Sequence, residues 1–208
     1  MNKIKQFQQK DIEILSKERV YDGFFKMEKV LFRHKLFAGG MSEIVCRELL
    51  LKGAASVVVA YDPRRDNVIL VEQVRIGAYD PHSTRSPWLL ELIAGMVESG
   101  ETAERVAMRE SAEEAGVQLE KLKYAFAAWD SPGGQSERLY FFAGKVDSSR
   151  ARGIHGLAAE HEDIKVHVVS REQAYQWVCD GTIDNGAAIM GLQWLQLNYQ
   201  CLQQEWAD

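Results

Sequence analysis

The feature that most constrains this chain is a cluster of three glutamates at helical spacing. Glu110, Glu113 and Glu114 lie at i, i+3 and i+4, so a helix places their carboxylates on one flank. Thr102 is a suitable N-cap and Gly116 a suitable C′ residue, which predicts a helix between them. Taken alone, the cluster fits a solvated acidic face. If it is partly buried, the repulsion is costly unless a cation binds there.

The residues around the cluster decide between these readings. They form a longer pattern: Gly95, five residues, Glu101, seven residues, Arg109-Glu110-Ser111, one residue, Glu113-Glu114, one residue, Gly116-Val117. This stretch resembles the motif of the Nudix hydrolase family at every polar and glycine position. Ser111 departs from it, because an aliphatic residue is usual there. Ser111 is small, so we expect looser packing behind the helix and no loss of function. Arg109 could pair with Glu101 and hold the loop onto the helix.

The resemblance implies a metal site and a reaction. Glu110 and Glu114 would be metal ligands, together with the backbone carbonyl of Ala94, and Glu113 would be a further catalytic carboxylate. Oxygen ligands of this kind suit Mg²⁺, with Mn²⁺ as an alternative. The family reaction is the hydrolysis of a nucleoside diphosphate linked to another group, in which metal ions polarise the phosphate oxygens and activate water.

Two features beyond the motif bear on the substrate. Pro132, in the segment Ser131-Pro-Gly-Gly134, follows Val117 by fifteen residues, a spacing that resembles the ADP-ribose pyrophosphatase branch of the family. The acidic segment 156–163 resembles the loop that supplies the catalytic base in the dimeric bacterial members. On that match Glu160 is the base and Glu162 contacts metal. An ordinary turn and a solvated loop are the alternatives.

The same resemblance implies substrate contacts elsewhere in the chain. These residues are Phe24, Arg47, Arg75, Ser131 and Glu137. Surface charges and core aromatics remain alternatives for them. The implied reaction is Mg²⁺-dependent hydrolysis of ADP-ribose to AMP and ribose 5-phosphate. The alternatives are a pyrophosphatase for another nucleotide sugar, such as GDP-mannose, and a non-catalytic ADP-ribose sensor.

The order of the expected elements predicts an α/β fold: a Nudix α/β/α sandwich with a mixed sheet, plus an N-terminal antiparallel β arm. We expect the arm over residues 1–50 and the Nudix hydrolase domain over 51–208. The arm is too small to be stable alone, and the resemblance implies that two subunits exchange it in a homodimer. Strands are expected at 24–27, 30–33, 43–50, 56–61, 68–74, 88–94, 122–129 and 138–146, and later helices at 170–179 and 185–203.

Composition narrows the setting of the protein. The net charge of −5 argues against nucleic acid as a partner. The sequence has neither a signal peptide nor an apolar run long enough to span a membrane, so we expect a cytoplasmic protein. Cys46, Cys179 and Cys201 form no CxxC pair, which argues against a disulfide framework or a zinc site. We expect reduced thiols that are mostly buried.

Overall fold

The computed structural model describes residue 4 and residues 6–207, and its chain divides into two compact units. Unit 1 comprises Met1–Gly53 and Trp129–Glu137, and unit 2 comprises Ala54–Ala128 and Arg138–Asp208. The segment 129–137 therefore groups with the N-terminal residues, although it lies far from them in sequence. The boundary that the sequence predicts at residue 50 takes no account of this segment.

Unit 1 is a three-stranded antiparallel sheet with the order β1-β2-β3. Its elements are η1 (Gln9–Asp11), β1 (Ile12–Asp22), β2 (Lys26–His34) and β3 (Val45–Leu51). The predicted antiparallel arm is confirmed, but the sequence did not predict β1. Register shifts between Ile14 and Ser16 and between Arg19 and Tyr21 interrupt its pairing with β2. Such bulges break the alternation by which a strand is recognised.

The segment 129–137, called the bound loop below, is attached to the end of β3 by backbone hydrogen bonds. The N–H of Leu50 donates to the carbonyl of Gly134 at 2.9 Å, and the N–H of Ser136 donates back to the carbonyl of Leu50 at 3.0 Å. The N–H of Lys52 also donates to the hydroxyl of Ser136 at 3.2 Å. The position of this loop therefore depends on the end of β3 and on Lys52, just after it.

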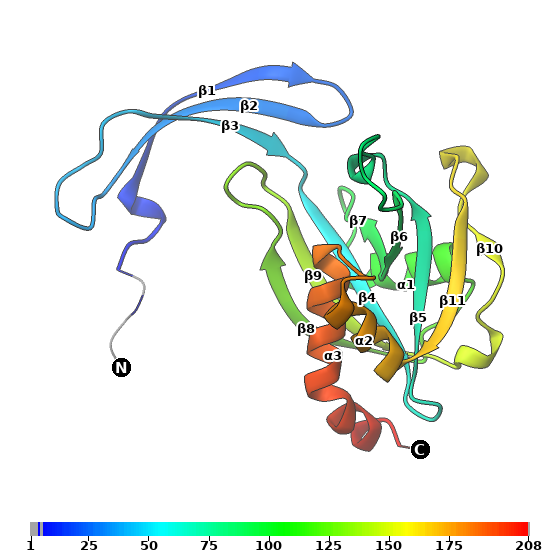
Figure 1. The fold of residues 1–208 in the computed structure, drawn as a ribbon. Helices are drawn as coiled ribbons and strands as arrows, with labels where there is room; N and C mark the ends of the chain where they lie inside the picture. The colour runs from blue at the N-terminus through cyan, green and yellow to red at the C-terminus, as the bar shows by residue number, and fades with distance from the viewer. Residues whose placement is uncertain (1–3, 5, 208) are drawn as a thin grey trace. The chain divides into compact units, whose positions relative to one another are not determined.

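Unit 2 is built on a mixed sheet (Figure 1), in the order β10-β11-β5-β4-β9-β8. The central strand β4 pairs in parallel with β9 and antiparallel with β5. The strands are β4 (Ala54–Asp62), β5 (Asn67–Val74), β6 (Trp88–Glu91), β7 (Ile93–Met96), β8 (Lys121–Trp129), β9 (Arg138–Lys145), β10 (Ile154–His155) and β11 (Ile164–Ser170). The helical elements are α1 (Ala103–Ala115), α2 (Arg171–Asp180), α3 (Gly186–Glu205), η2 (Ile76–Ala78), η3 (Ser148–Arg150) and η4 (Ala158–Glu160).

Alternate residues of β4 supply two separate cores. Val57 and Val59 belong to the cluster that includes α2 and α3, whereas Val58 and Ala60 belong to the cluster that includes α1. Successive side chains of a strand point to opposite faces. Figure 1 accordingly shows α1 on one face of the sheet and α2 with α3 on the other. The predicted α/β/α sandwich is confirmed.

The helix ends follow their predicted caps. The hydroxyl of Thr102 accepts the N–H of Arg105 and begins α1, and Gly116 ends it with a φ of 63°. A left-handed residue at this position costs least when it is glycine. The hydroxyl of Ser170 accepts the N–H of Gln173 and begins α2. These caps are local, so they could be predicted from short stretches of sequence.

The sheet opens where β6 and β7 lie. β4 and β5 pair only from Ala60 to Asp62. Beyond that point, β6 pairs with β5 and β7 pairs with β4. The prediction of one strand over 88–94 was therefore wrong, because two short strands with different partners meet at Leu92. This opening brings β5, β6, β7 and α1 together in unit 2.

Two further expectations concern exposure and the membrane. All three cysteines are free, as expected, but each is exposed, so the prediction of mostly buried thiols was wrong. Among the described residues, no helix is both long enough and apolar enough to cross a bilayer.

Candidate active site

Glu114 is a buried carboxylate held from two sides. Its residue is only 4% exposed. One carboxylate oxygen accepts the backbone N–H of Ala94 at 3.0 Å, and the other lies 3.4 Å from the side-chain nitrogen of Gln73. These contacts join α1 to β7 and to β5. Sequence reasoning missed Gln73; a lone glutamine on an otherwise apolar strand face is the signal that could have found it.

Glu110 lies against the backbone of β7 one helical turn earlier. A Cβ atom built on Gly95 would lie 1.8 Å from a carboxylate oxygen of Glu110. The backbone of Gly95 does not have a positive φ. Glycine is therefore needed here for space, because the carboxylate of Glu110 occupies the position where a side chain would begin.

We expect Gly95→Ala to damage the site more than the fold. The clashing atom is the end of a flexible side chain, so stability should fall by less than the roughly 1–3 kcal/mol of a rigid overpacked core. Displacing the Glu110 carboxylate by about 1 Å should lower activity by on the order of 100-fold. Thermal unfolding and steady-state kinetics on one preparation would check both expectations. A large loss of stability with normal turnover would contradict this view of Gly95.

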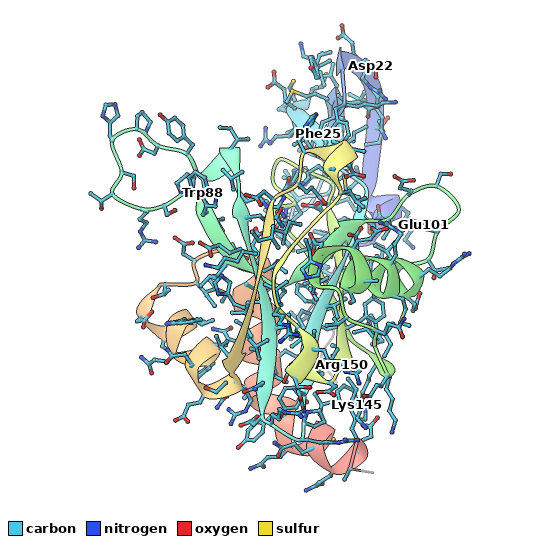
Figure 2. All side chains as sticks on the ribbon, turned by 90° about the vertical axis from the view of Figure 1, so that its right-hand side faces the viewer. Asp22, Phe25, Trp88, Glu101, Lys145 and Arg150 are labelled. Atoms are coloured by element: carbon cyan, nitrogen blue, oxygen red, sulfur yellow. The ribbon has the colours of Figure 1, made fainter. Side chains whose placement is uncertain are left out.

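Arg109 joins the loop before α1 to the glutamate cluster. Its guanidinium lies 3.5 Å from Glu101, 2.8 Å from Glu110 and 2.9 Å from Glu113. Figure 2 shows Glu101 in the loop that leads into α1. The predicted pairing of Arg109 with Glu101 is confirmed. Ser111 is fully buried, and its hydroxyl donates to the carbonyl of Ala107 at 2.8 Å, so its polar group is satisfied within the helix.

Burial shifts the ionisation of both inward-facing glutamates. Burial raises the pKa of Glu114 from 4.5 to about 8; the N–H of Ala94 opposes this shift and the charge of Glu110 adds to it. Burial likewise raises the pKa of Glu110 to about 7 and outweighs the nearby Arg109. If both desolvated carboxylates were ionised near neutral pH, their negative charges would be poorly compensated by the surrounding protein.

Arg75 and Glu162 contribute charge to the same region of unit 2. The positive charge of Arg75 lowers the pKa of Glu114, and the negative charge of Glu162 raises it. One carboxylate oxygen of Glu162 accepts the N–H of Leu157 at 3.0 Å, which folds the acidic loop back on itself. Glu160 lies exposed at the end of η4. The structure thus brings Glu162 into electrostatic range of the cluster and leaves Glu160 facing solvent.

The other predicted substrate residues belong to unit 1. Phe24 is 84% exposed in the turn between β1 and β2, where Figure 2 labels its neighbours Asp22 and Phe25. Arg47 is exposed on β3. Ser131 begins the turn of the bound loop, since its carbonyl accepts the N–H groups of residues 134 and 135.

Glu137, by contrast, is buried and already has a partner. It is 8% exposed, and its carboxylate lies 2.6 Å from the ammonium group of Lys52. That ammonium group also lies 5.8 Å from the ring centre of Phe25. Sequence reasoning missed Lys52, because 85 residues separate it from Glu137.

The donor set of the α1 cluster fits a hard divalent cation. Its side-chain donors are carboxylate oxygens, and two of them are desolvated with raised pKa values. Within residue 4 and residues 6–207, no three His, Cys, Asp or Glu side chains already converge on one metal position. Glu110 and Glu113 both contact Arg109 in this structure instead. The residues are therefore suited to a cation by chemistry and burial.

The sandwich fold and the cluster of carboxylates on α1 define a recognised class of protein. Residues 51–185 match the NUDIX domain, and the chain belongs to the Nudix hydrolase family. The family prediction from the glutamate pattern is confirmed. Members of this family generally need a divalent metal.

Individual relatives are similar over nearly the whole chain. The ADP-ribose pyrophosphatase of Haemophilus influenzae is 66% identical over 99% of this chain and 95% of its own length. The enzyme of the same name from Escherichia coli K12 is 54% identical over 97% of this chain and 95% of its own. A GDP-mannose pyrophosphatase from Yersinia pestis is 31% identical over 90% of this chain and 93% of its own. A crystal structure of an ADP compounds hydrolase, 17% identical, superposes with a TM-score of 0.71 over 95% of this chain and 98% of that one, and supports the fold.

Proposed function

We propose that this protein hydrolyses the diphosphate of ADP-ribose, with Mg²⁺, to AMP and ribose 5-phosphate. The observation that carries the proposal is the pair of carboxylates, half-buried Glu110 and buried Glu114, on a helix held against β7. The full-length similarity to ADP-ribose pyrophosphatases supports this substrate over other nucleotide sugars.

In this proposal Glu110 and Glu114 hold the divalent cation. The N–H of Ala94 faces Glu114 although Ala94 pairs with Val57 of β4. In an extended strand the N–H and C=O of one residue leave on the same edge. The carbonyl of Ala94 therefore lies on the side of the strand away from β4, which supports it as a third ligand.

The remaining residues act on the substrate. When bound, Mg²⁺ neutralises charge on the diphosphate and makes water easier to ionise. Glu160 takes a proton from the water that attacks one phosphorus, and Glu113 and Glu162 add carboxylates around the metal. Arg75 neutralises phosphate oxygens, a role that suits a guanidinium. Phe24, Arg47, Ser131 and Glu137 contact the nucleoside and the terminal ribose.

A substrate panel tests the proposal. The protein would be incubated with Mg²⁺ and each of ADP-ribose, GDP-mannose and ADP-glucose, and kcat/KM would be measured for each. We expect ADP-ribose to have the highest value, with AMP among its products. A preference for GDP-mannose would overturn the substrate and leave the hydrolase standing. Binding of ADP-ribose without any AMP would favour a non-catalytic sensor.

The raised pKa values predict that metal binding depends on pH. In the unfolded chain both glutamates ionise near 4.5, whereas burial raises their pKa to about 7 and about 8 in the fold. The metal-free fold therefore holds more protons than the unfolded chain and loses stability as pH rises from about 4.5 to 8. A bound cation needs both carboxylates ionised, so its affinity should rise over the upper part of this range.

The measurement is the increase in melting temperature on adding Mg²⁺. We expect a larger increase at pH 8.5 than at pH 6. Calorimetry in two buffers at pH 6.5 should detect the release of on the order of one proton per metal-binding event. An equal increase at both pH values would contradict the assignment of these two glutamates as ligands.

We further propose that a second copy of this chain covers the arm in a homodimer with exchanged arms. Every residue of β1 is exposed, including Ile12, Ile14 and Tyr21. Unit 1 also holds a largely apolar hollow of about 400 Å³, whose lining includes Phe32 and Phe37. Apolar surface of this kind marks an interface. Light scattering should give twice the 23.6 kDa mass of the chain. A monomer would refute the dimer.

The cytoplasmic location stays a prediction.

A further inference from the structure

Glu91 is a half-buried partner of Arg75 that the sequence did not single out. One of its carboxylate oxygens accepts the Nε–H of Arg75 at 2.9 Å and lies 2.8 Å from Nη2 of the same guanidinium. The side chain of Glu91 is 15% exposed and that of Arg75 is 46% exposed. The glutamate is thus the more enclosed member of the pair, and the arginine reaches solvent.

The sheet register explains why these two side chains meet. Glu91 of β6 pairs with Val71 of β5, and cross-strand partners point to the same face. Gln73 and Arg75 follow Val71 at steps of two, so they share that face. Gln73 contacts Glu114 there. Glu91 therefore draws the Arg75 side chain back along β5, on the face that carries the carboxylate cluster.

The backbone around Arg75 is fixed as well. Its N–H donates to the carbonyl of Pro87 at 2.8 Å, and its carbonyl accepts the N–H of Ala78 at 2.8 Å. These bonds close the base of the loop that ends at Trp88, which Figure 2 shows projecting from unit 2. The Arg75 side chain can still rotate, and its contacts with Glu91 hold the guanidinium end.

We propose that Glu91 is a positioning residue that holds the guanidinium of Arg75 ready for the substrate diphosphate. Arginine has five N–H groups, and its contacts with Glu91 through Nε and Nη2 leave the others available to phosphate oxygens. Holding the guanidinium in place before binding reduces the entropy that the complex would otherwise lose. This inference rests on the proposed contact between Arg75 and the diphosphate.

The test is a double-mutant cycle on the full chain. Glu91→Ala, Arg75→Ala and the double variant would be compared for kcat/KM and for the Kd of ADP with Mg²⁺, measured by calorimetry. We expect Glu91→Ala to weaken both quantities by roughly 10- to 100-fold in the wild-type background. In the Arg75→Ala background the same change should cost no more than about twofold, because Glu91 acts through Arg75.

Two further variants separate positioning from general stability. Glu91→Gln keeps an oxygen that can accept both N–H bonds, so it should retain ADP affinity within about threefold. Asp184→Ala removes an ion pair with Arg85, which lies on the loop between Arg75 and Trp88, and leaves the contacts of Arg75 intact. It should leave the Kd of ADP unchanged. The proposal would be overturned if Asp184→Ala weakened ADP binding as much as Glu91→Ala does. It would also be overturned if Glu91→Ala had the same effect in the Arg75→Ala background as in the wild type.

The double-mutant cycle tests Glu91 whichever nucleotide sugar is the substrate. If the substrate panel favours GDP-mannose, the same variants would be compared on that substrate and with GDP. The proposed substrate would then be wrong, while the positioning role of Glu91 would still be tested. On the substrate that the wild-type protein prefers, Glu91→Ala could have the same effect with and without Arg75, within about twofold. That result would refute the role of Glu91 and leave the proposed function standing.

Discussion

Glu114→Gln should lower kcat by on the order of 10²–10³-fold or more, the scale of losing one preorganised charge stabiliser. The variant keeps the size of the side chain and an oxygen that can accept the N–H of Ala94, which lies 3.0 Å from the carboxylate. It removes a negative charge at a position that is 4% exposed. Steady-state kinetics at saturating Mg²⁺ would measure the loss.

The matched control for this variant is Glu104→Gln. Glu104 lies in the first turn of the same helix and is exposed. Its neutralisation should leave kcat within about twofold, since exposed single charges act weakly. The fold of Glu114→Gln should be at least as stable as the wild type without metal above neutral pH, because the pKa of Glu114 is raised to about 8. Near wild-type turnover would refute the metal assignment.

Glu160→Gln should cost roughly 10²–10⁴-fold in kcat if Glu160 is the general base. Glu160 lies exposed at the end of η4 and is not one of the proposed metal ligands. Metal binding should therefore be largely kept in this variant. The Mg²⁺-dependent increase in melting temperature and the kcat would be measured together.

Glu162→Gln is the informative comparison for the base. Glu162 lies in the same loop, and its charge raises the pKa of both Glu110 and Glu114. Its neutralisation should change metal affinity as well as turnover. If Glu160→Gln turns over normally while Glu162→Gln does not, the base is Glu162 and the role assigned to Glu160 is wrong.

The residues of the motif could be predicted because the interactions that place them are local. Thr102 and Gly116 cap α1 through bonds within one or two turns. Glu110 and Glu114 then share a flank by helical geometry alone. The departure at Ser111 also has a local explanation, since its hydroxyl bonds to the preceding turn. Sequence spacing is a reliable guide to contacts of this range.

Contacts between distant segments were not accessible in the same way. Gln73 meets Glu114 across 41 residues and Lys52 meets Glu137 across 85. The strand expected over 88–94 divides because β6 and β7 pair with different neighbours. Strand pairing and register are set by the whole sheet, so a short apolar run does not reveal its partner.

The sequence by itself determined the helix, its caps, its glutamates and the family to which they belong. Only the tertiary structure decided that Glu110 and Glu114 are desolvated, that Glu91 holds Arg75, and that the segment 129–137 joins the arm. The physical reason is that helix geometry follows from bonds between neighbours, whereas burial and pairing depend on what the rest of the chain places alongside.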